Sequence, residues 1–270
     1  MKGLKGACIF GQSGGPTSVI NASAAGVFIE ALNQELITDV YGAAHGIRGI
    51  LEEKFYDISK EDVKELELMK YTPSSALGSV RYKLKDPAVD DTDYKRLLEV
   101  FKKYNIRYFF YNGGNDSMDT CNKVSKYLKS VSYDCNVIGV PKTIDNDLYG
   151  TDHCPGYGSA AKYISTTLME LNLDAKVYDT GLIVVVEVMG RNAGWLTAAA
   201  ALAGYKGLGP DLIYLPEVPF DIDGFVQDVK DVCARNNNKC IAVVSEGIKD
   251  KTASISAISL HPQPTCSVTL

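Results

Sequence analysis

The chain has 270 residues, which is long enough to bury a large core and to form two lobes. Its 28 basic and 33 acidic residues give a net charge of −5, and this balance argues against a nucleic-acid-binding surface, which would need a basic patch. Seven irregularly spaced cysteines and three histidines, with no CxxC pair, indicate reduced thiols rather than a disulfide framework or a zinc site.

Apolar runs of strand length alternate along the chain with segments of helical period. In chain order, we expect strands at residues 6–10, 39–43, 108–112, 137–140, 182–188, 211–215 and 240–245. We expect helices at residues 19–32, 93–103, 117–128, 159–172, 193–203 and 224–236. Near-continuous apolar strands separated by helices predict an α/β fold with two lobes, each a mostly parallel sheet with helices on both faces.

Residues 148–157 contain two glycines and a proline, and they read as a passage between the two lobes. We therefore expect one lobe at residues 1–150 and another at residues 151–248. Residues 249–270 are polar and rich in Ser and Thr, which predicts a poorly ordered tail. The longest apolar stretches are too short to span a bilayer, and the N-terminus lacks the pattern of a signal peptide, so we expect a cytoplasmic protein that does not bind membranes.

The turn at residues 141–147, Pro-Lys-Thr-Ile-Asp-Asn-Asp, directly follows a predicted strand. Open α/β sheets bind ligands at such strand ends. There Asp145 can accept a proton from a hydroxyl group, and Lys142 can neutralise the charge of a phosphoryl group. The alternative interpretation is an Asx-rich turn without a catalytic role, because Asn and Asp favour turns for their own reasons.

Two glycine-rich segments, residues 11–16 and 113–117, each follow a predicted strand and precede a predicted helix. Such loops let backbone N–H groups and the positive end of a helix approach an anion, although many of them only close a tight turn. Asn115, Asp116 and Ser117 also suit the N-cap of the following helix. The functional interpretation is that oxygen ligands in this segment hold Mg²⁺.

Met189, Gly190 and Arg191 follow the longest apolar strand, so Arg191 should emerge at a strand end as well. A guanidinium group is suited to bidentate contact with phosphate, but an exposed Arg in isolation is usually only solvated. Arg81 is ambiguous for the same reason. Trp195, the single tryptophan, is expected to pack in the core.

Six motifs together resemble those of the phosphofructokinase family, in the family's order and approximate spacing over residues 4–247. They are Ser13-Gly14-Gly15, Leu-Gly-Ser-Val-Arg ending at Arg81, Gly-Gly-Asn-Asp-Ser ending at Ser117, Thr-Ile-Asp-Asn-Asp at 143–147, Met-Gly-Arg at 189–191 and Ser-Glu-Gly at 245–247. No single motif would make the match, whereas six in order make a specific one. The resemblance implies that residues 1–150 bind a phosphoryl donor and that residues 151–248 bind a sugar phosphate.

The resemblance also implies roles for the residues that match the sugar-binding motifs. Thr143, Ile144 and Asp145 would bind fructose 6-phosphate, and Asp145 would be the base for its 1-hydroxyl group. Residues 189–191 (Met189, Gly190 and Arg191) would contact the sugar phosphate. Arg191 would also stabilise the transferring charge, and Glu246 would hold sugar hydroxyl groups.

On the donor side, the resemblance implies that Gly15, Asp116 and Ser117 contact the phosphoryl donor and that Arg81 bridges the donor and acceptor phosphates. Members that use ATP have Gly at the positions of Asp116 and Lys142, whereas this chain is similar to members that use pyrophosphate. A carboxylate at Asp116 would repel the α-phosphate of a nucleotide, and Lys142 would suit a small and highly charged donor. We therefore expect a glycolytic phosphotransferase that converts fructose 6-phosphate and pyrophosphate to fructose 1,6-bisphosphate, with an ATP-dependent 6-phosphofructokinase as the alternative.

Two departures from the family pattern leave further alternatives open. Asn115 stands where the family usually has an Mg²⁺-ligating Asp, so Asp116 would take more of that role. Residues 247–270 do not match the segment with which family members return to the first lobe, so the tail would stand in place of that segment. A catalytically silent binding or regulatory subunit is therefore a second hypothesis, and we expect a homo-oligomer if the family interface is present. A nicotinamide-dependent dehydrogenase ranks third, because the chain has no dinucleotide-binding fingerprint.

Overall fold

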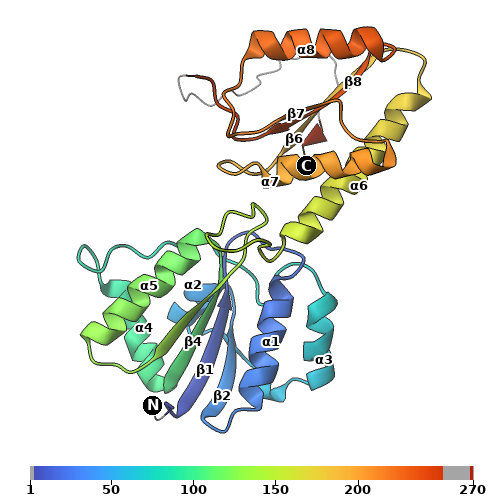
Figure 1. The fold of residues 1–270 in the computed structure, drawn as a ribbon. Helices are drawn as coiled ribbons and strands as arrows, with labels where there is room; N and C mark the ends of the chain where they lie inside the picture. The colour runs from blue at the N-terminus through green and yellow to red at the C-terminus, as the bar shows by residue number, and fades with distance from the viewer. Residues whose placement is uncertain (1–2, 252–267, 270) are drawn as a thin grey trace. The chain divides into compact units, whose positions relative to one another are not determined.

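The computed structural model describes residues 3–251 and 268–269 of the chain. The chain divides into two units, Met1–Thr143 and Ile144–Leu270, and each unit contains one β-sheet (Figure 1). The division falls inside the turn at residues 141–147, whereas the expected lobe boundary is at residue 150.

The N-terminal unit has a five-stranded sheet in the order β3-β2-β1-β4-β5, which is parallel except for β3. Its strands are β1 (Gly6–Gln12), β2 (Ile37–Ala43), β3 (Phe55–Asp57), β4 (Ile106–Gly113) and β5 (Asn136–Pro141). Its helices are α1 (Ile20–Leu32), α2 (Gly46–Leu51), α3 (Val63–Leu68), α4 (Thr92–Lys103) and α5 (Asn115–Ser130), with 3₁₀ turns η1 (Ile58–Lys60) and η2 (Met69–Tyr71). Figure 1 shows α1 and α3 on one side of the sheet and α4 and α5 on the other.

The sequence of β1 explains why this sheet is covered on both faces. Ala7 and Ile9 belong to the hydrophobic core formed with α2, α4 and α5, whereas Cys8 and Phe10 belong to the core formed with α1 and α3. Successive side chains of a strand point to opposite faces, so a strand buried on both sides needs an unbroken apolar run. All seven residues of β1 are buried accordingly.

The C-terminal unit has a four-stranded sheet in the order β7-β8-β6-β9, and all of its pairs are parallel. Its strands are β6 (Leu182–Val188), β7 (Leu212–Tyr214), β8 (Lys239–Ser245) and β9 (Val268–Thr269). Its helices are α6 (Tyr157–Val177), α7 (Trp195–Ala199), η3 (Ala200–Lys206) and α8 (Ile222–Arg235).

Successive side chains of β8 also point into two different hydrophobic cores, one on each face of the sheet. Ile241 and Val243 pack with residues of α6 and α7, whereas Cys240 and Ala242 pack with residues of α8. The predicted α/β fold, with two mostly parallel sheets covered by helices, is therefore confirmed.

The structure adds three short elements, α2, β3 and α3, between β2 and α4, and it starts α7 at Trp195 rather than at residue 193. The expectation that Trp195 packs in the core is wrong, because its side chain is 54% exposed. Trp195 is the first residue of α7, and the neighbouring Leu196, only 1% exposed, turns into the core instead. The side chains of neighbouring helical residues point in different directions around the helix axis, so only one of these two can face the sheet.

Most of the predicted tail, residues 252–267 and Leu270, lies outside the described residues. Within it, Val268–Thr269 forms β9 and pairs in parallel with Val186 and Glu187 of β6. Among the residues that the structure describes, no helix has the length and apolar character that a membrane crossing requires.

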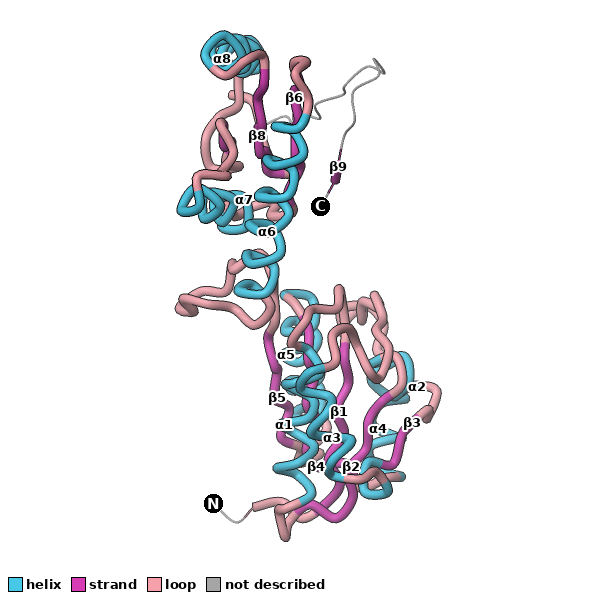
Figure 2. Tube along the Cα trace, turned by 90° about the vertical axis from the view of Figure 1, so that its right-hand side faces the viewer, coloured by secondary structure: helices cyan, strands magenta, loops and turns pink. Residues whose placement is uncertain are grey.

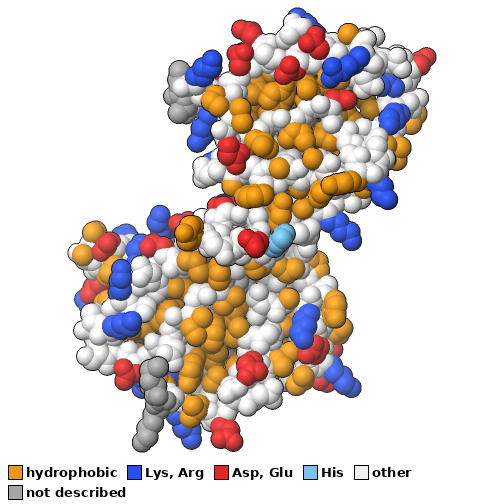
Figure 3. All heavy atoms as spheres, in the orientation of Figure 1, with side chains coloured by type: hydrophobic (Ala, Val, Ile, Leu, Met, Phe, Trp, Pro, Cys, Tyr) orange, Lys and Arg blue, Asp and Glu red, His pale blue; other side chains and the backbone are white. Residues whose placement is uncertain are grey.

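The N-terminal sheet has β5 at one edge, as Figure 2 shows. Ile138, in the middle of β5, is 42% exposed, and Figure 3 shows hydrophobic side chains gathered on the visible face of this unit. An edge strand with exposed apolar side chains is a surface on which a further strand can pair.

Candidate active site

Three loops of the N-terminal unit meet at the carboxyl edge of its sheet. Because β1, β4 and β5 are neighbouring parallel strands, the segments that follow them lie side by side. Two backbone hydrogen bonds join these segments: Ser13 N–H donates to Asn112 O (2.8 Å), and Lys142 N–H donates to Gly113 O (3.0 Å). The fold therefore brings both glycine-rich segments and Lys142 together.

Lys142 is a buried cation within these loops. Its side chain is 6% exposed, and its Nζ donates a hydrogen bond to the carbonyl oxygen of Gly15. Burying an ammonium group costs free energy unless acceptors or anions surround it. The contact with Gly15 therefore fixes a positive charge in the loop that the resemblance assigns to the phosphoryl donor.

Buried hydroxyl groups join the loops that follow β1 and β4. Ser117 Oγ donates to Ser13 Oγ (3.0 Å), which itself hydrogen bonds to Val80 O (3.3 Å). Their close approach depends on Gly113, because a Cβ there would lie 2.0 Å from Ser117 Oγ. Ser117 is therefore a packing residue of the loop junction as well as a predicted donor ligand.

The titratable groups beneath these loops are neutral. Burial raises the pKa of the Tyr111 phenol in β4, and a hydrogen bond with Ser13 offsets part of that rise. Burial also raises the pKa of the Cys121 thiol in α5 to about 12. Neither this phenol nor this thiol therefore adds charge to the loops at neutral pH.

Asn115 and Asp116 lie in the first turn of α5, and both are exposed. The Asp116 side chain is 87% exposed, and its Oδ1 is 3.8 Å from Lys83 Nζ. No group of three or more His, Cys, Asp or Glu side chains suited to a metal ion occurs within residues 3–251 and 268–269. Mg²⁺ is commonly bound through one or two carboxylates, with phosphate oxygens and water completing its shell, so Asn115 and Asp116 fit an Mg²⁺ ion carried by a phosphate ligand.

Arg81 is exposed in a segment without regular secondary structure that leads from η2 to α4. The preceding residue is bonded to the glycine-rich loop, since Gly14 N–H donates to Val80 O (3.2 Å). The structure therefore places Arg81 next to the loop after β1, which contains Gly15.

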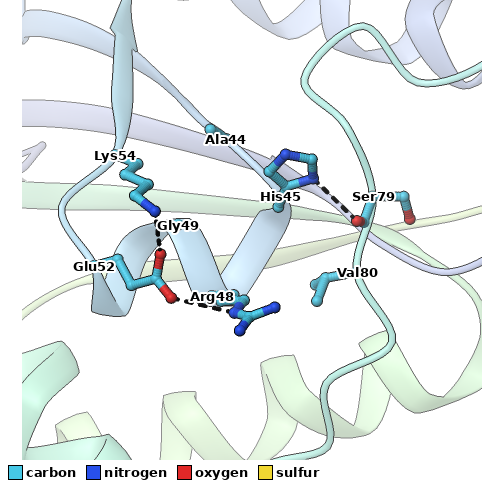
Figure 4. Close-up of a pocket in the computed structure, with 8 residues that line it drawn as sticks. All are labelled: Ala44, His45, Arg48, Gly49, Glu52, Lys54, Ser79 and Val80. Atoms are coloured by element: carbon cyan, nitrogen blue, oxygen red, sulfur yellow. Dashed lines mark hydrogen bonds and ion pairs between the residues drawn. The ribbon is translucent and has the colours of Figure 1, made fainter.

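A pocket of about 380 Å³ lies beside the same segment, between residues 44–54 and residues 79–80 (Figure 4). In Figure 4, Glu52 pairs with both Arg48 (Nε, 3.2 Å) and Lys54 (Nζ, 2.6 Å), and His45 Nδ1 lies 3.3 Å from Ser79 O. The hydrogen bond from Lys54 is the main cause that lowers the pKa of Glu52, with Arg48 contributing less. Sequence reasoning gave no indication of this pocket.

The turn that carries Asp145 is held by Asn146. Asn146 is 6% exposed with a φ of 59°; its Oδ1 accepts from Cys154 N–H (2.8 Å), and its Nδ2 donates to Asp152 O (3.0 Å). The Asx-turn interpretation thus describes Asn146. Asp145 remains half-buried, as do Thr143 and Ile144, and Ile144 packs against the core of the C-terminal unit.

The segments after β6 and β8 interlock at the carboxyl edge of the C-terminal sheet. Gly190 N–H donates to Glu246 Oε1 (3.2 Å), and Ser245 Oγ donates to Gly190 O (2.8 Å). Gly247 touches the backbone of Arg191, because a Cβ at position 247 would lie 1.9 Å from Arg191 O. The two loops therefore hold each other through a backbone contact and through the side chains of Ser245 and Glu246.

Met189 and Arg191 are both exposed at this edge, and Glu246 is half-buried with one carboxylate oxygen on Gly190. The predicted sugar-side residues of the two strands are thus adjacent within the C-terminal unit. The predicted donor-side residues are adjacent within the N-terminal unit.

Sequence reasoning missed Gln12, Asn21 and Asn112, which are all buried next to the donor loops. Gln12 and Asn112 are polar residues at the ends of long apolar strands, and that position was the available signal. Their partners lie far away in the sequence, so the pattern alone could not name them.

Parallel strands that end in glycine-rich loops around a buried lysine are an arrangement in which many α/β proteins bind anions. The chain belongs to the phosphofructokinase family, because the family model described as Phosphofructokinase matches residues 8–265. A pyrophosphate–fructose 6-phosphate 1-phosphotransferase of Halomonas elongata is 48% identical over 245 residues, which are 89% of this chain and 58% of that protein.

A protein of the same name from Xanthomonas campestris is also 48% identical, over 91% of this chain and 59% of its own length. The crystal structure of a pyrophosphate-dependent phosphofructokinase from Nitrosospira multiformis matches with a TM-score of 0.83 and 44% identity, covering 91% of this chain and 62% of that chain. The chain thus spans about three fifths of the length of these relatives.

Proposed function

We propose that the chain transfers a phosphoryl group from pyrophosphate to the 1-hydroxyl group of fructose 6-phosphate, giving fructose 1,6-bisphosphate, in the cytoplasm. The observation that carries the proposal is Lys142, a buried ammonium group bonded to Gly15 O inside a glycine-rich loop. A fixed positive charge there suits a small and highly charged anion, and the names of the relatives reported above point to the same donor.

In this proposal, the N-terminal unit binds the donor. Gly15 and Ser117 contact the pyrophosphate, and Arg81 bridges the donor and acceptor phosphates. Lys142 neutralises charge on the transferring group. Mg²⁺, held by Asn115 and Asp116 with phosphate oxygens, supplies further charge neutralisation when it is bound.

The sugar phosphate is bound by the C-terminal unit and the adjoining turn. Thr143, Ile144 and Asp145 orient the sugar, and Asp145 accepts the proton of the attacking 1-hydroxyl group. Met189, Gly190 and Arg191 bind the 6-phosphate, and Glu246 accepts hydrogen bonds from sugar hydroxyl groups. The bond from Gly190 N–H to Glu246 Oε1 supports this pairing, since it orients the carboxylate from within the unit.

Donor choice is tested by an assay with pyrophosphate and ATP as rival donors under the same Mg²⁺ concentration. We expect turnover with pyrophosphate and little with ATP, and equal or better turnover with ATP would overturn the donor assignment. The double variant Asp116→Gly with Lys142→Gly should shift the preference toward ATP. An unchanged preference would remove these two residues from donor selection.

One observation favours ATP as a second candidate. The pocket of about 380 Å³ beside Ser79 is large enough for part of a nucleotide, because ligand pockets start at about 300 Å³. Arg48→Trp would fill this pocket, so it should raise the KM for ATP if a nucleotide binds there and leave the KM for pyrophosphate unchanged.

The second hypothesis of a catalytically silent subunit makes a different prediction. Isothermal titration would then detect binding of pyrophosphate and fructose 6-phosphate to the purified chain without turnover of either. A homo-oligomer is the association we propose, supported by the exposed Ile138 on the edge strand β5, and size-exclusion chromatography with light scattering measures it.

A further inference from the structure

A buried pair of amide side chains holds the segment that leads to Arg81. Gln12, the last residue of β1, is 0% exposed, and Asn21, in the first turn of α1, is 1% exposed. Gln12 Nε2 donates to Asn21 Oδ1 (3.0 Å), so the two side chains form one unit. None of the roles considered above uses either residue.

The pair is bonded to the segment at four points. Gln12 Oε1 accepts from Leu77 N–H (3.0 Å) and from Ser75 Oγ (2.8 Å). Asn21 Oδ1 accepts from Ala76 N–H (2.8 Å), and Asn21 Nδ2 donates to Thr72 O (2.9 Å). These contacts span 51 to 65 residues of sequence.

These bonds supply hydrogen-bond partners for backbone groups of the segment. Residues 72–81 form no helix or strand, so their buried backbone groups have no ladder to pair with. Gln12 satisfies the N–H group of Leu77, which is buried, and Asn21 bonds to the N–H group of Ala76 and the C=O group of Thr72, which are more exposed residues. Their arrangement therefore fixes the path of the backbone here.

The far end of the segment meets the donor loop. Val80 O accepts from Gly14 N–H (3.2 Å) and from Ser13 Oγ (3.3 Å), and Ser79 Oγ donates to Gly14 O. Gln12 directly precedes Ser13, so the same stretch of chain holds the segment at both ends. Arg81 directly follows Val80, so these bonds fix the backbone immediately before it.

We infer that Gln12 and Asn21 are positioning residues that set Arg81 against the donor loop. They act by fixing the backbone of the segment that leads to Arg81, through their bonds to residues 72–77. The inference rests on the proposed function for the role of Arg81 toward pyrophosphate. It adds a specific requirement, which is that two buried amides outside the proposed ligand contacts govern donor affinity.

Gln12→Leu tests the inference, because it removes every bond of the Gln12 amide with little change in volume. Hydrogen exchange should become at least about tenfold faster at Ala76 and Leu77, and the Kd for pyrophosphate in isothermal titration should rise about tenfold. Gln12→Glu keeps an acceptor for Leu77 N–H and Ser75 Oγ, so it should retain more affinity than Gln12→Leu. Gln34→Leu is the matched control, since Gln34 is an exposed residue whose amide bonds only to Glu30.

A double-mutant cycle with Arg81→Ala separates positioning from general destabilisation. If Gln12 acts through Arg81, Gln12→Leu should change the Kd by less than about twofold in the Arg81→Ala background. Additive effects of the two variants would overturn the inference, as would faster exchange at Ala76 and Leu77 with unchanged pyrophosphate affinity. Exchange that does not change in Gln12→Leu overturns it without involving the proposed function. Failure of the unaltered chain to bind pyrophosphate would instead overturn the donor assignment.

Discussion

The two units close their strand-end loops in different ways. In the N-terminal unit, buried polar side chains do this: Lys142 bonds to Gly15 O, and Ser117 bonds to Ser13. In the C-terminal unit, the backbones of the loops after β6 and β8 pack directly against each other, with Gly247 against Arg191 O, in addition to the bonds of Ser245 and Glu246 with Gly190. The difference suggests that side-chain changes in the N-terminal unit alter ligand affinity first, whereas an added Cβ in the C-terminal unit alters the fold first.

Gly247→Ala is expected to have the largest effect. A Cβ at this position would lie 1.9 Å from Arg191 O and 2.5 Å from Arg191 C, so the backbone of the β6 loop must move. We expect a loss of about 3 kcal/mol or more in the free energy of unfolding of the C-terminal unit.

Each unit carries its own reporter of unfolding, because Cys8 and Cys240 are both 0% exposed. In mild denaturant, Gly247→Ala should accelerate alkylation of Cys240 and leave that of Cys8 unchanged, as peptide mass spectrometry would measure. Gly158→Ala is the matched control, since a Cβ there meets nothing within 4 Å. Equal acceleration at both thiols would mean that the units do not unfold separately.

Lys142→Met is the corresponding test in the N-terminal unit. Methionine keeps most of the side-chain volume but removes the charge and the hydrogen bond to Gly15 O. We expect the Kd for pyrophosphate to rise about 10- to 100-fold, with the free energy of unfolding lowered by less than about 1 kcal/mol. A large loss of stability without a change in affinity would reverse the assignment of side chains to ligand binding.

Alkaline pH should destabilise both units through their buried thiols. Burial raises the pKa of Cys8 to about 12, and it is also the main cause that raises the pKa of Cys240 to about 12, against about 9 for an exposed thiol. A raised pKa in the folded state gives stability that is present below pH 9 and is lost as the pH rises from 9 toward 12. Each thiol should therefore lower the free energy of unfolding by about 1.4 kcal/mol between pH 8 and pH 10.

Urea unfolding monitored by circular dichroism at pH 8, 9 and 10 measures this loss. Cys8→Ala should reduce the pH dependence of the N-terminal unit, in which Cys121 also has a raised pKa, and Cys240→Ala should reduce that of the C-terminal unit. A slope that does not respond to Cys8→Ala would show that other groups cause the alkaline loss.

The sequence predicted the main strands and helices because burial on both faces requires unbroken apolar runs such as 182–188, which is β6 to the residue. It missed α2, since Gly-Ile-Arg-Gly-Ile-Leu has two helix-weakening glycines and follows His45 in a left-handed conformation. It also missed β3, whose three residues are too few to show a period. Trp195 was misassigned because composition favours burial, whereas the start of α7 decides which of two neighbours faces the core.

The candidate site also has some features that the local sequence predicts and others that depend on distant contacts. Strand-end motifs such as residues 113–117 can be predicted from the local sequence, because glycines and polar residues interrupt an apolar pattern. The bonds of Gln12 and Asn21 with residues 72–77 span 51 to 65 residues, and the bond of Lys142 with Gly15 spans 127, which no local pattern contains. The assignment of roles to Asp145, Arg191 and Glu246 rests on the family resemblance and stays a prediction.

Lys83→Ala is expected to have the smallest effect on stability. Lys83 Nζ lies 3.8 Å from Asp116 Oδ1, and both side chains are largely exposed, at 74% and 87%. Exposed ion pairs contribute little to folding, so the free energy of unfolding should change by less than about 0.5 kcal/mol. Because Lys83 stands beside a predicted metal ligand, the Kd for pyrophosphate should still rise, by less than about threefold, and less at high salt. Lys85→Ala removes a similarly exposed pair with Asp90 and should change neither quantity. A loss above about 1 kcal/mol in Lys83→Ala would mean that exposed charges also hold this unit together, so its stability would not depend on buried side chains alone.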